Sequence, residues 1–252
     1  MLSPLRESVV PQSIEPFRPL PRNEVLKSLP SDEFVRLRPL LTRVKLVNGF
    51  ELYTPGERIE HVYFIEQGFA SIVAEVDDFA SSIEVGLQGR ESMTGLTSLL
   101  APDATAFNRV MVQLPGAALR MSAGALRDCV ETMPVLRQSL FRALEALLAQ
   151  ISQTAACNAL HSLPERLARW LLMAHDRVDG DELHLTQEFL AIMLAVRRPG
   201  VSVAIGTLQA AGLLRHQRGR ILISDRAGLE AAGCDCYRRV KLFTDSLAAR
   251  DD

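Results

Sequence analysis

The sequence lacks the features that mark membrane and secreted proteins. Nearly half of its 252 residues (48%) are hydrophobic, yet no uninterrupted apolar run approaches the length of a membrane span. Residues 1–8 do not show the basic-then-apolar pattern of a signal peptide. We therefore expect a cytoplasmic chain with no membrane segment, whose apolar residues form a sizeable core.

Cysteine is scarce, which limits both disulfides and metal sites. The four cysteines could form two disulfides, but a cytoplasmic chain of this size seldom needs them. Cys234 and Cys236 could ligate zinc, but the sequence has no second pair of this kind. Zinc is the weaker alternative, and we expect no metal site and no cofactor. Cys157 is interpreted as a small core residue rather than a redox switch.

Catalytic motifs are missing as well. The sequence shows no Ser/His/Asp or paired-carboxylate constellation, no phosphate loop and no metal triad, so we expect a protein that is not an enzyme. The net charge is only −2, which means that any binding of a polyanion must come from a local basic patch.

Residues 42–121 contain many short apolar runs separated by turn signals. Asn48-Gly49, Gln67-Gly68 and Gln88-Gly89 are examples of these signals. Short strands at this spacing predict an antiparallel barrel or roll, which could hold a small molecule. Two short helices are predicted before it, from Asn23 onward, and residues 1–22 are proline-rich and read as an extended tail. We therefore assign residues 23–133 to an effector domain.

Residues 134–160 change to helical periodicity. Pro134 opens the segment, and leucines and isoleucine follow at roughly heptad spacing: Leu136, Leu140, Leu144, Leu147 and Ile151. A long helix with one apolar seam predicts self-pairing in a homodimer. The alternative is a helix that is buried against its own barrel.

Residues 185–214 read as two short helices with a tight corner between them. Thr186 is a plausible N-cap of the first helix, and Pro199 suits the first turn of the second. Val201, Ile205 and Leu208 mark the inward face of the second helix. This pattern is typical of a helix-turn-helix that places its second helix in the major groove of DNA. A helical hairpin with a solvated face is the alternative.

A basic β-hairpin is predicted directly after the second helix, with strands near residues 213–214 and 221–223. Between residues 185 and 226 the acids are only Glu188 and Asp225, whereas the bases are Arg197, Arg198, Arg215, Arg218, Arg220 and Arg226. Because the whole chain is nearly neutral, this local excess of positive charge indicates a nucleic-acid-binding face with a wing.

The order of barrel, long helix, helix-turn-helix and wing resembles the cyclic-AMP receptor protein / fumarate-nitrate regulator (Crp/Fnr) family of bacterial transcription factors. The resemblance covers about residues 24–236. It is carried by Pro55-Gly56-Glu57, by residues 61–68, by the loop glycines Gly89 and Gly95, and by residues 166–172, 186–191, 196–202 and 208–214.

This resemblance implies an α+β fold with an N-terminal antiparallel β-roll of the cyclic-nucleotide-binding type. A dimerisation helix at 134–160 and a C-terminal winged helix-turn-helix at 161–236 would follow, and we expect residues 237–252 to form a tail. The implied partners are a second copy of the chain, double-stranded DNA with a palindromic operator, RNA polymerase and an unknown small-molecule effector.

The resemblance also implies which residues contact DNA. Arg198 would read a guanine edge, with Arg197, Ser202 and Thr186 near phosphates. Gly200 stands where Thr or Ser is common, and Val203 replaces a frequent second arginine, which favours contact with a thymine methyl group. The full predicted set is Thr186, Gln187, Arg197, Arg198, Pro199, Gly200, Ser202, Val203, Arg218 and Arg220.

The implied effector pocket departs from the cyclic-nucleotide pattern. Its predicted residues are Gly89, Glu91, Gly95, Leu96, Asn108 and Arg109. Leu96 replaces the glutamate that would bind the ribose, and Arg109 lacks the adjacent hydroxyl that would help to bind the phosphate. We therefore expect Arg109 to pair with an acid such as Glu91, and cyclic nucleotides not to bind tightly. No cysteine precedes Cys129, which excludes the family's N-terminal iron–sulfur signature.

The leading hypothesis is a sequence-specific, DNA-binding transcription regulator that acts as a homodimer. An effector signal at the roll would shift the DNA-binding domains through the 134–160 helix. The alternative is a ligand-binding or protein-interaction module that has lost DNA binding; Arg197 and Arg198 argue against it.

Overall fold

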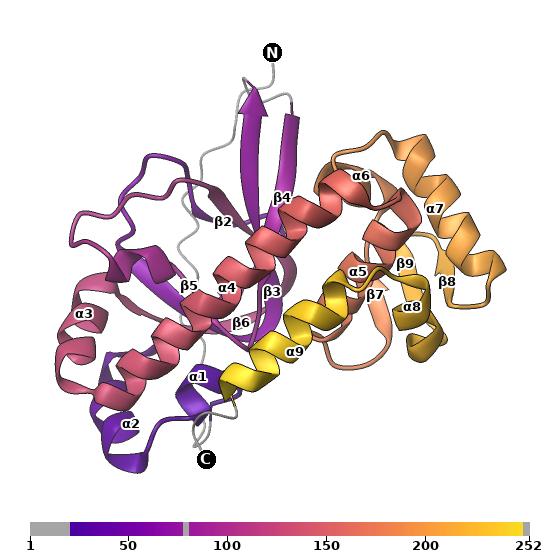
Figure 1. The fold of residues 1–252 in the computed structure, drawn as a ribbon. Helices are drawn as coiled ribbons and strands as arrows, with labels where there is room; N and C mark the ends of the chain where they lie inside the picture. Colours follow the sequence, from indigo (N-terminus) through magenta and orange to yellow (C-terminus); the bar gives the residue numbers. More distant parts are fainter. Residues whose placement is uncertain (1–20, 78–80, 249–252) are drawn as a thin grey trace.

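The computed structural model describes residues 21–77 and 81–248. The predicted tail at 1–22 lies outside the described residues except for its last two. Figure 1 shows a β-roll with a long helix across it and a smaller unit of helices and short strands at the far end of that helix. This architecture confirms the α+β fold class.

The roll is an antiparallel sheet preceded by short helices. The helices are α1 (Glu24–Lys27), α2 (Ser31–Leu37) and the 3-10 turn η1 (Arg38–Leu40). The strands are β1 (Thr42–Leu46), β2 (Glu51–Tyr53), β3 (His61–Asp77), β4 (Ser81–Gln88), β5 (Met93–Thr94) and β6 (Arg109–Ser122), with η2 (Leu96–Leu99) after β5. Their order is β1-β6-β3-β4, with β2 added to β6 and β5 to β3.

One glycine allows the two longest strands to bend together. The pairing of β3 with β6 shifts register around Gly68, which has a φ of 82°. A Cβ atom there would lie 2.3 Å from the carbonyl oxygen of Leu114. Only glycine fits this bulge, which curls the sheet into a roll.

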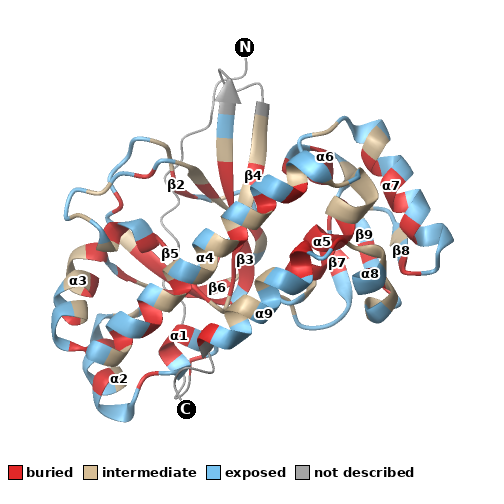
Figure 2. Cartoon of the chain, in the orientation of Figure 1, coloured by how far each residue is buried: buried red, intermediate tan, exposed pale blue. Residues whose placement is uncertain are grey.

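Helices α3 (Ala123–Thr132) and α4 (Pro134–Leu160) follow the roll, and α4 is the helix predicted at 134–160. The apolar residues that were predicted to pair with a second α4 do not all face outward. Leu136 and Leu140 are fully buried in the roll's own core, and Leu144 and Leu147 pack against that core. The outward face instead exposes Phe141 and Leu148. Buried, intermediate and exposed residues alternate along α4 (Figure 2). Helical periodicity identifies an apolar face but not the partner that covers it.

The smaller unit is built around α5 (Leu163–His175), α6 (Gln187–Met193), α7 (Arg198–Ala210) and α8 (Arg226–Ala232). A sheet of β7 (Glu182–His184), β9 (Arg220–Ile223) and β8 (Leu214–Gln217) completes it. The predicted hairpin is therefore present, and β7 pairs with β9 as a third strand. Among the described residues, no single helix is long and apolar enough to cross a membrane. Helices α6 and α7 are long and apolar enough only when they are taken together, and they are bent by 106° relative to each other.

The predicted tail at 237–252 is wrong over most of its length. Residues 236–248 form α9 (Cys236–Ala248), which packs on α4 and lies beside it in Figure 1. Tyr237 and Leu247 are buried, and Val240 and Phe243 are partly buried between them. This helical spacing of apolar residues was a usable sequence signal for the helix.

Candidate nucleic-acid interface and its joint with the roll

The corner between α6 and α7 has the geometry of a helix-turn-helix. The Thr186 hydroxyl accepts a hydrogen bond from the Phe189 N–H (3.1 Å) and so caps α6. The chain turns at Ala195, whose φ is 49°, and the two helices meet at a bend of 106°. This bend lies inside the range of roughly 90–120° that helix-turn-helix units show.

Helix α7 is anchored by one face and free on the other. Val201, Ile205 and Leu208 are buried, as predicted, together with Ala204. The outward residues are Arg198, Pro199, Ser202 and Val203, and the Val203 side chain is 70% exposed. An apolar side chain so exposed on the outward face of α7 is available to contact a thymine methyl group.

Gly200 is placed differently from the rest of the predicted DNA-contacting set. A Cβ atom at this position would lie 3.2 Å from Cδ2 of Leu163, the first residue of α5. The small residue therefore serves close packing of α7 on α5.

The remaining predicted contacts come together on one surface. The Ser202 hydroxyl donates a hydrogen bond to Oε1 of Gln187 (2.6 Å), which joins the starts of α6 and α7. The wing tip is also close, because a Cβ atom on Gly219 would lie 3.6 Å from Cγ2 of Thr186. We call this face the reader surface; it comprises Thr186, Gln187, Arg197, Arg198, Pro199, Ser202, Val203 and Arg218.

The wing is a tight hairpin whose tip is Arg218-Gly219. Both residues have positive φ values (47° and 77°), as a two-residue turn between twisted strands requires. Arg220 is held by Glu182 of β7, with 3.2 Å between Nη1 and Oε1. Among the described residues no ion pair engages Arg197, Arg198 or Arg218. The reader surface therefore presents uncompensated cations, which is the electrostatic requirement for binding phosphates.

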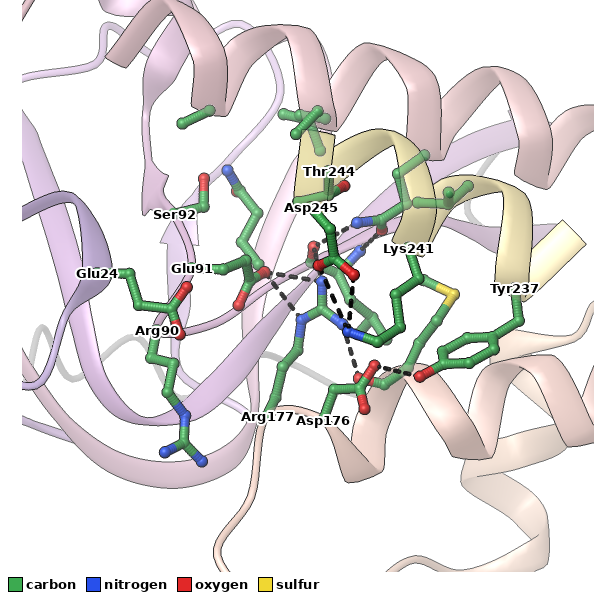
Figure 3. A pocket seen from close by; sticks show the side chains of 18 residues that line it. Glu24, Arg90, Glu91, Ser92, Asp176, Arg177, Tyr237, Lys241, Thr244 and Asp245 are labelled. Carbon is green, nitrogen blue, oxygen red and sulfur yellow. Dashed lines mark hydrogen bonds and ion pairs between the residues drawn. The ribbon is translucent and has the colours of Figure 1, made fainter. Parts of the chain in front are cut away.

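A charged pocket of about 330 Å³ lies where the roll, α4, α5 and α9 meet. Figure 3 shows side chains from these elements pointing into it, and Arg177 lies at its centre. The Nε of Arg177 donates to Glu91 in the roll (2.9 Å), and its Nη1 donates to the Met173 carbonyl oxygen (2.6 Å). Arg177 therefore ties the end of α5 to the roll, and we call this region the joint.

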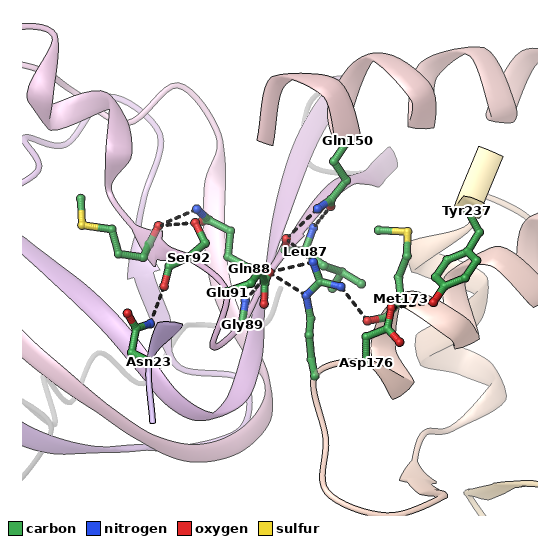
Figure 4. Close-up of polar contacts among 12 residues, drawn as sticks. Asn23, Leu87, Gln88, Gly89, Glu91, Ser92, Gln150, Met173, Asp176 and Tyr237 are labelled. Atoms are coloured by element: carbon green, nitrogen blue, oxygen red, sulfur yellow. Dashed lines mark hydrogen bonds and ion pairs between the residues drawn. The ribbon is translucent and has the colours of Figure 1, made fainter. Parts of the chain in front are cut away.

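Two further contacts reinforce the joint. The Gln150 side chain accepts the Leu87 N–H (2.6 Å) and donates to the Leu87 carbonyl oxygen (3.1 Å), which fixes α4 to β4 (Figure 4). Asp179 pairs with Arg22 and Arg90 at 2.6 and 3.1 Å, and hydrogen bonding to Arg22 lowers the pKa of its carboxyl group.

A buried carboxyl group also connects the roll to α5. Glu84 of β4 is 5% exposed and accepts hydrogen bonds from Nε1 of Trp170 (2.7 Å) and from the Ser71 hydroxyl (2.5 Å). Burial raises its pKa from 4.5 to about 7, although both hydrogen bonds and the nearby Arg169 and Arg177 oppose the shift. Trp170 is buried in the core, and its indole N–H also joins α5 to the roll.

The predicted effector residues do not form one pocket. Gly95, Leu96 and Asn108 line a cavity of about 110 Å³ inside the roll. Gly89 and Glu91 belong to the joint, where a Cβ atom on Gly89 would lie 2.8 Å from Cγ of Arg177. The roll cavity is far smaller than the roughly 300 Å³ of ordinary small-molecule sites.

Tyr53 explains part of this small volume. Its hydroxyl is hydrogen-bonded to Thr94 (3.0 Å) and donates to the His61 carbonyl oxygen (2.9 Å), so the ring is fixed inside the roll. A Cβ atom on Gly95 would lie 2.6 Å from the Tyr53 hydroxyl oxygen.

Arg109 pairs with acids, but not with the one that was predicted. Its guanidinium lies 3.3 Å from Glu51 and 2.6 Å from Glu75, whereas Glu91 is bound to Arg177. The register of β6 places Arg109 beside β2 and β3, because these strands are its neighbours in the sheet. Two carboxylates already neutralise the cation that would otherwise bind a cyclic phosphate.

The structure also brings together cysteines that the sequence analysis treated separately. One ligand atom each from Cys157, His161, Cys234 and Cys236 lies within 4.8 Å of the others. Burial raises the pKa of the Cys157 thiol, and it raises that of the Cys234 thiol to about 12.

Comparison with known proteins finds similarity both for the helix-turn-helix unit and for most of the chain. Residues 165–232 match the Crp-like helix-turn-helix domain. The CRP-like cAMP-activated global transcriptional regulator of Mycobacterium tuberculosis is 25% identical over 218 residues, which cover 82% of this chain and 94% of the relative.

Solved structures share the fold. FixK2 from Bradyrhizobium japonicum superposes with a TM-score of 0.66 at 16% identity, covering 77% of this chain and 98% of FixK2. The c-di-GMP responsive global regulator CLP of Xanthomonas campestris gives a TM-score of 0.62 at 19% identity, covering 77% and 99%. The chain therefore contains a Crp-like helix-turn-helix domain at residues 165–232, and its overall fold is similar to that of these regulators.

Proposed function

We propose that this protein is a transcription regulator of the Crp/Fnr type, which binds a palindromic operator as a homodimer and reads its sequence through α7. The observation that carries the proposal is the reader surface, on which unpaired arginines flank the exposed outward face of a helix that is anchored from behind. The partners are double-stranded DNA, a second copy of the chain and, at a promoter in the cytoplasm, RNA polymerase.

The roles of the reader residues follow from their chemistry. Arg198 can fork onto the two acceptors of a guanine edge, and Val203 can contact a thymine methyl group. Arg197, Ser202, Thr186 and Arg218 surround this pair and supply phosphate contacts, which fix the position of the helix without reading sequence. Gln187 orients Ser202 through their hydrogen bond.

The dimer forms through the outward face of α4. Phe141 and Leu148 are seven residues apart and are 51% and 57% exposed, with the partly buried Leu144 between them and the exposed Ala155 one heptad further on. A heptad of exposed apolar residues is self-complementary in a parallel helix pair. Two-fold pairing would also place two α7 helices for two half-sites of a palindrome.

The signal that controls binding passes through the joint. Because Arg177, Gln150 and Trp170 connect the roll to α4 and α5, a shift of β4 would move the DNA-binding unit relative to the roll. Cyclic nucleotides are not the signal, since the roll cavity is small and Arg109 is already paired. Calorimetry with cyclic AMP tests this point, and micromolar binding would contradict it.

The experiment for DNA reading is selection from a random duplex pool with purified full-length protein and no added ligand. We expect a two-fold palindrome to be enriched by the wild type and lost with Arg198→Ala. Arg58→Ala, an exposed roll arginine, is the matched control and should enrich the same palindrome. If neither the protein alone nor the protein with cell extract enriches any sequence, the alternative of a binding module without DNA recognition is favoured.

A further inference from the structure

Two segments that are far apart in sequence meet where α4 ends and α9 begins. Cys157 lies in the last turn of α4, and His161 is the C-cap residue, whose backbone N–H donates to the Cys157 carbonyl oxygen. Cys234 lies just before α9, and Cys236 is its first residue. The three cysteines are buried, and His161 is partly exposed.

The spacing of these groups is that of a tetrahedral metal site. Zinc–sulfur bonds of about 2.3 Å and zinc–nitrogen bonds of about 2.0 Å place neighbouring ligand atoms roughly 3.5–3.8 Å apart. The Sγ atoms of Cys157 and Cys234 are 3.5 Å apart, and Sγ of Cys236 is 3.5 Å from Nδ1 of His161. All four ligand atoms lie within 4.8 Å of one another, so they can surround one ion with small adjustments.

The donor chemistry favours one class of metal. Three thiolates and one imidazole select soft or borderline ions, and Cys₃His is a donor set of structural zinc sites. Nε2 of Gln153 donates to Sγ of Cys236 (3.1 Å), a contact of the kind that orients metal ligands. Four protein ligands leave no open position for a substrate, so such an ion is structural.

We propose that Cys157, His161, Cys234 and Cys236 bind a single Zn²⁺ ion that clamps the start of α9 onto the end of α4. The clamp has a structural consequence at the joint, because Tyr237, Lys241 and Asp245 of α9 line the joint pocket. The Tyr237 hydroxyl also donates to Asp176 beside α5 (2.9 Å). The ion therefore holds α9 across the elements that connect the roll to the DNA-binding unit.

The competing use of these thiols is a disulfide between Cys157 and Cys234, whose sulfurs are already close. The two alternatives differ in metal content and in mass, since a disulfide removes two hydrogens and leaves too few thiolates for a Cys₃His site. A metal measurement and intact-mass analysis on the same sample therefore distinguish them.

The test uses the full-length chain, purified anaerobically and without added reductant from cells grown with zinc. Elemental analysis should find about one zinc per chain, and this should fall to near zero in Cys234→Ser and in His161→Ala. Cys129→Ser is the matched control, because this buried cysteine lies in the roll's core, and it should keep its zinc. Circular dichroism on each variant shows whether the loss of zinc occurs in a folded chain.

A second readout needs no variant. One equivalent of Co²⁺ added to the metal-free wild type should give the absorption bands of a tetrahedral, thiolate-bound ion, and a chelator should speed hydrogen exchange in α9. Zinc-free wild type with no thiolate–cobalt bands would overturn the proposal. A Cys157–Cys234 disulfide in freshly purified protein, or equal loss of zinc in Cys129→Ser, would overturn it as well.

Discussion

The buried carboxyl group of Glu84 makes the stability of this protein depend on pH. Its pKa is about 7 in the folded chain and 4.5 in the absence of burial, so the folded state binds a proton more tightly than the unfolded state. The contribution of Glu84 is therefore fully present below about pH 4.5 and is lost as the pH rises towards and past 7. At about 1.36 kcal/mol per pKa unit, the full shift corresponds to about 3 kcal/mol.

Replacing Glu84 by glutamine isolates this effect. The amide keeps the shape and both hydrogen bonds, because its oxygen can accept from Trp170 and its nitrogen can donate to Ser71. Between pH 5 and pH 8.5, the free energy of unfolding of the wild type should fall by about 2.5 kcal/mol more than that of Glu84→Gln. The gap should be widest at high pH, where the variant is the more stable protein.

Urea unfolding at a series of pH values measures this gap. Glu145→Gln, on the exposed side of α4, is the matched control and should follow the wild type at every pH. If the curves of wild type and Glu84→Gln run parallel from pH 5 to pH 8.5, the argument that burial raises the pKa of Glu84 is refuted.

Three further variants test other parts of the structure. Leu148→Asp removes an exposed apolar residue from each copy of α4 and should weaken the dimer at least about a hundredfold in analytical ultracentrifugation, because two leucines together contribute about 3 kcal/mol or more; an unchanged dimer would contradict the assigned seam. Arg177→Ala leaves Glu91 without its ion-pair partner and should lower the free energy of unfolding in urea by about 1–2 kcal/mol. The control is Arg238→Ala, which breaks the exposed pair with Asp235 and should lower it by less than about 0.5 kcal/mol. Val203→Ala should relax selection at one thymine position and weaken binding less than tenfold; loss of the whole palindrome would refute its assigned role.

Local patterns predicted the DNA-binding unit well because its signals are local. The N-cap at Thr186, the buried spacing of Val201 and Ile205, and the presence of a hairpin after α7 each depend on a few neighbouring residues. Caps, turns and the buried face of a helix each leave a recognisable pattern in a short stretch of sequence. The DNA contacts themselves stay predictions, since they depend on a partner.

The errors concern pairings across the chain. The heptad of α4 was assigned to a partner helix, although Leu136 and Leu140 are covered by the roll. Arg109 and Glu91 each form an ion pair, but strand register gives them different partners. Cys157 and Cys234 are 77 residues apart, and only the packing of α9 on α4 brings them together.

The most direct test of the proposed function is the affinity for the selected palindrome, measured by fluorescence anisotropy with wild type, Arg198→Ala and Arg58→Ala at one salt concentration. A lost bidentate guanine contact costs about 1–3 kcal/mol in each half-site, so Arg198→Ala should bind at least about tenfold more weakly. Binding of Arg198→Ala to a scrambled duplex should fall much less. Equal affinities of wild type and Arg198→Ala for the palindrome would contradict the assignment of α7 as the reading helix.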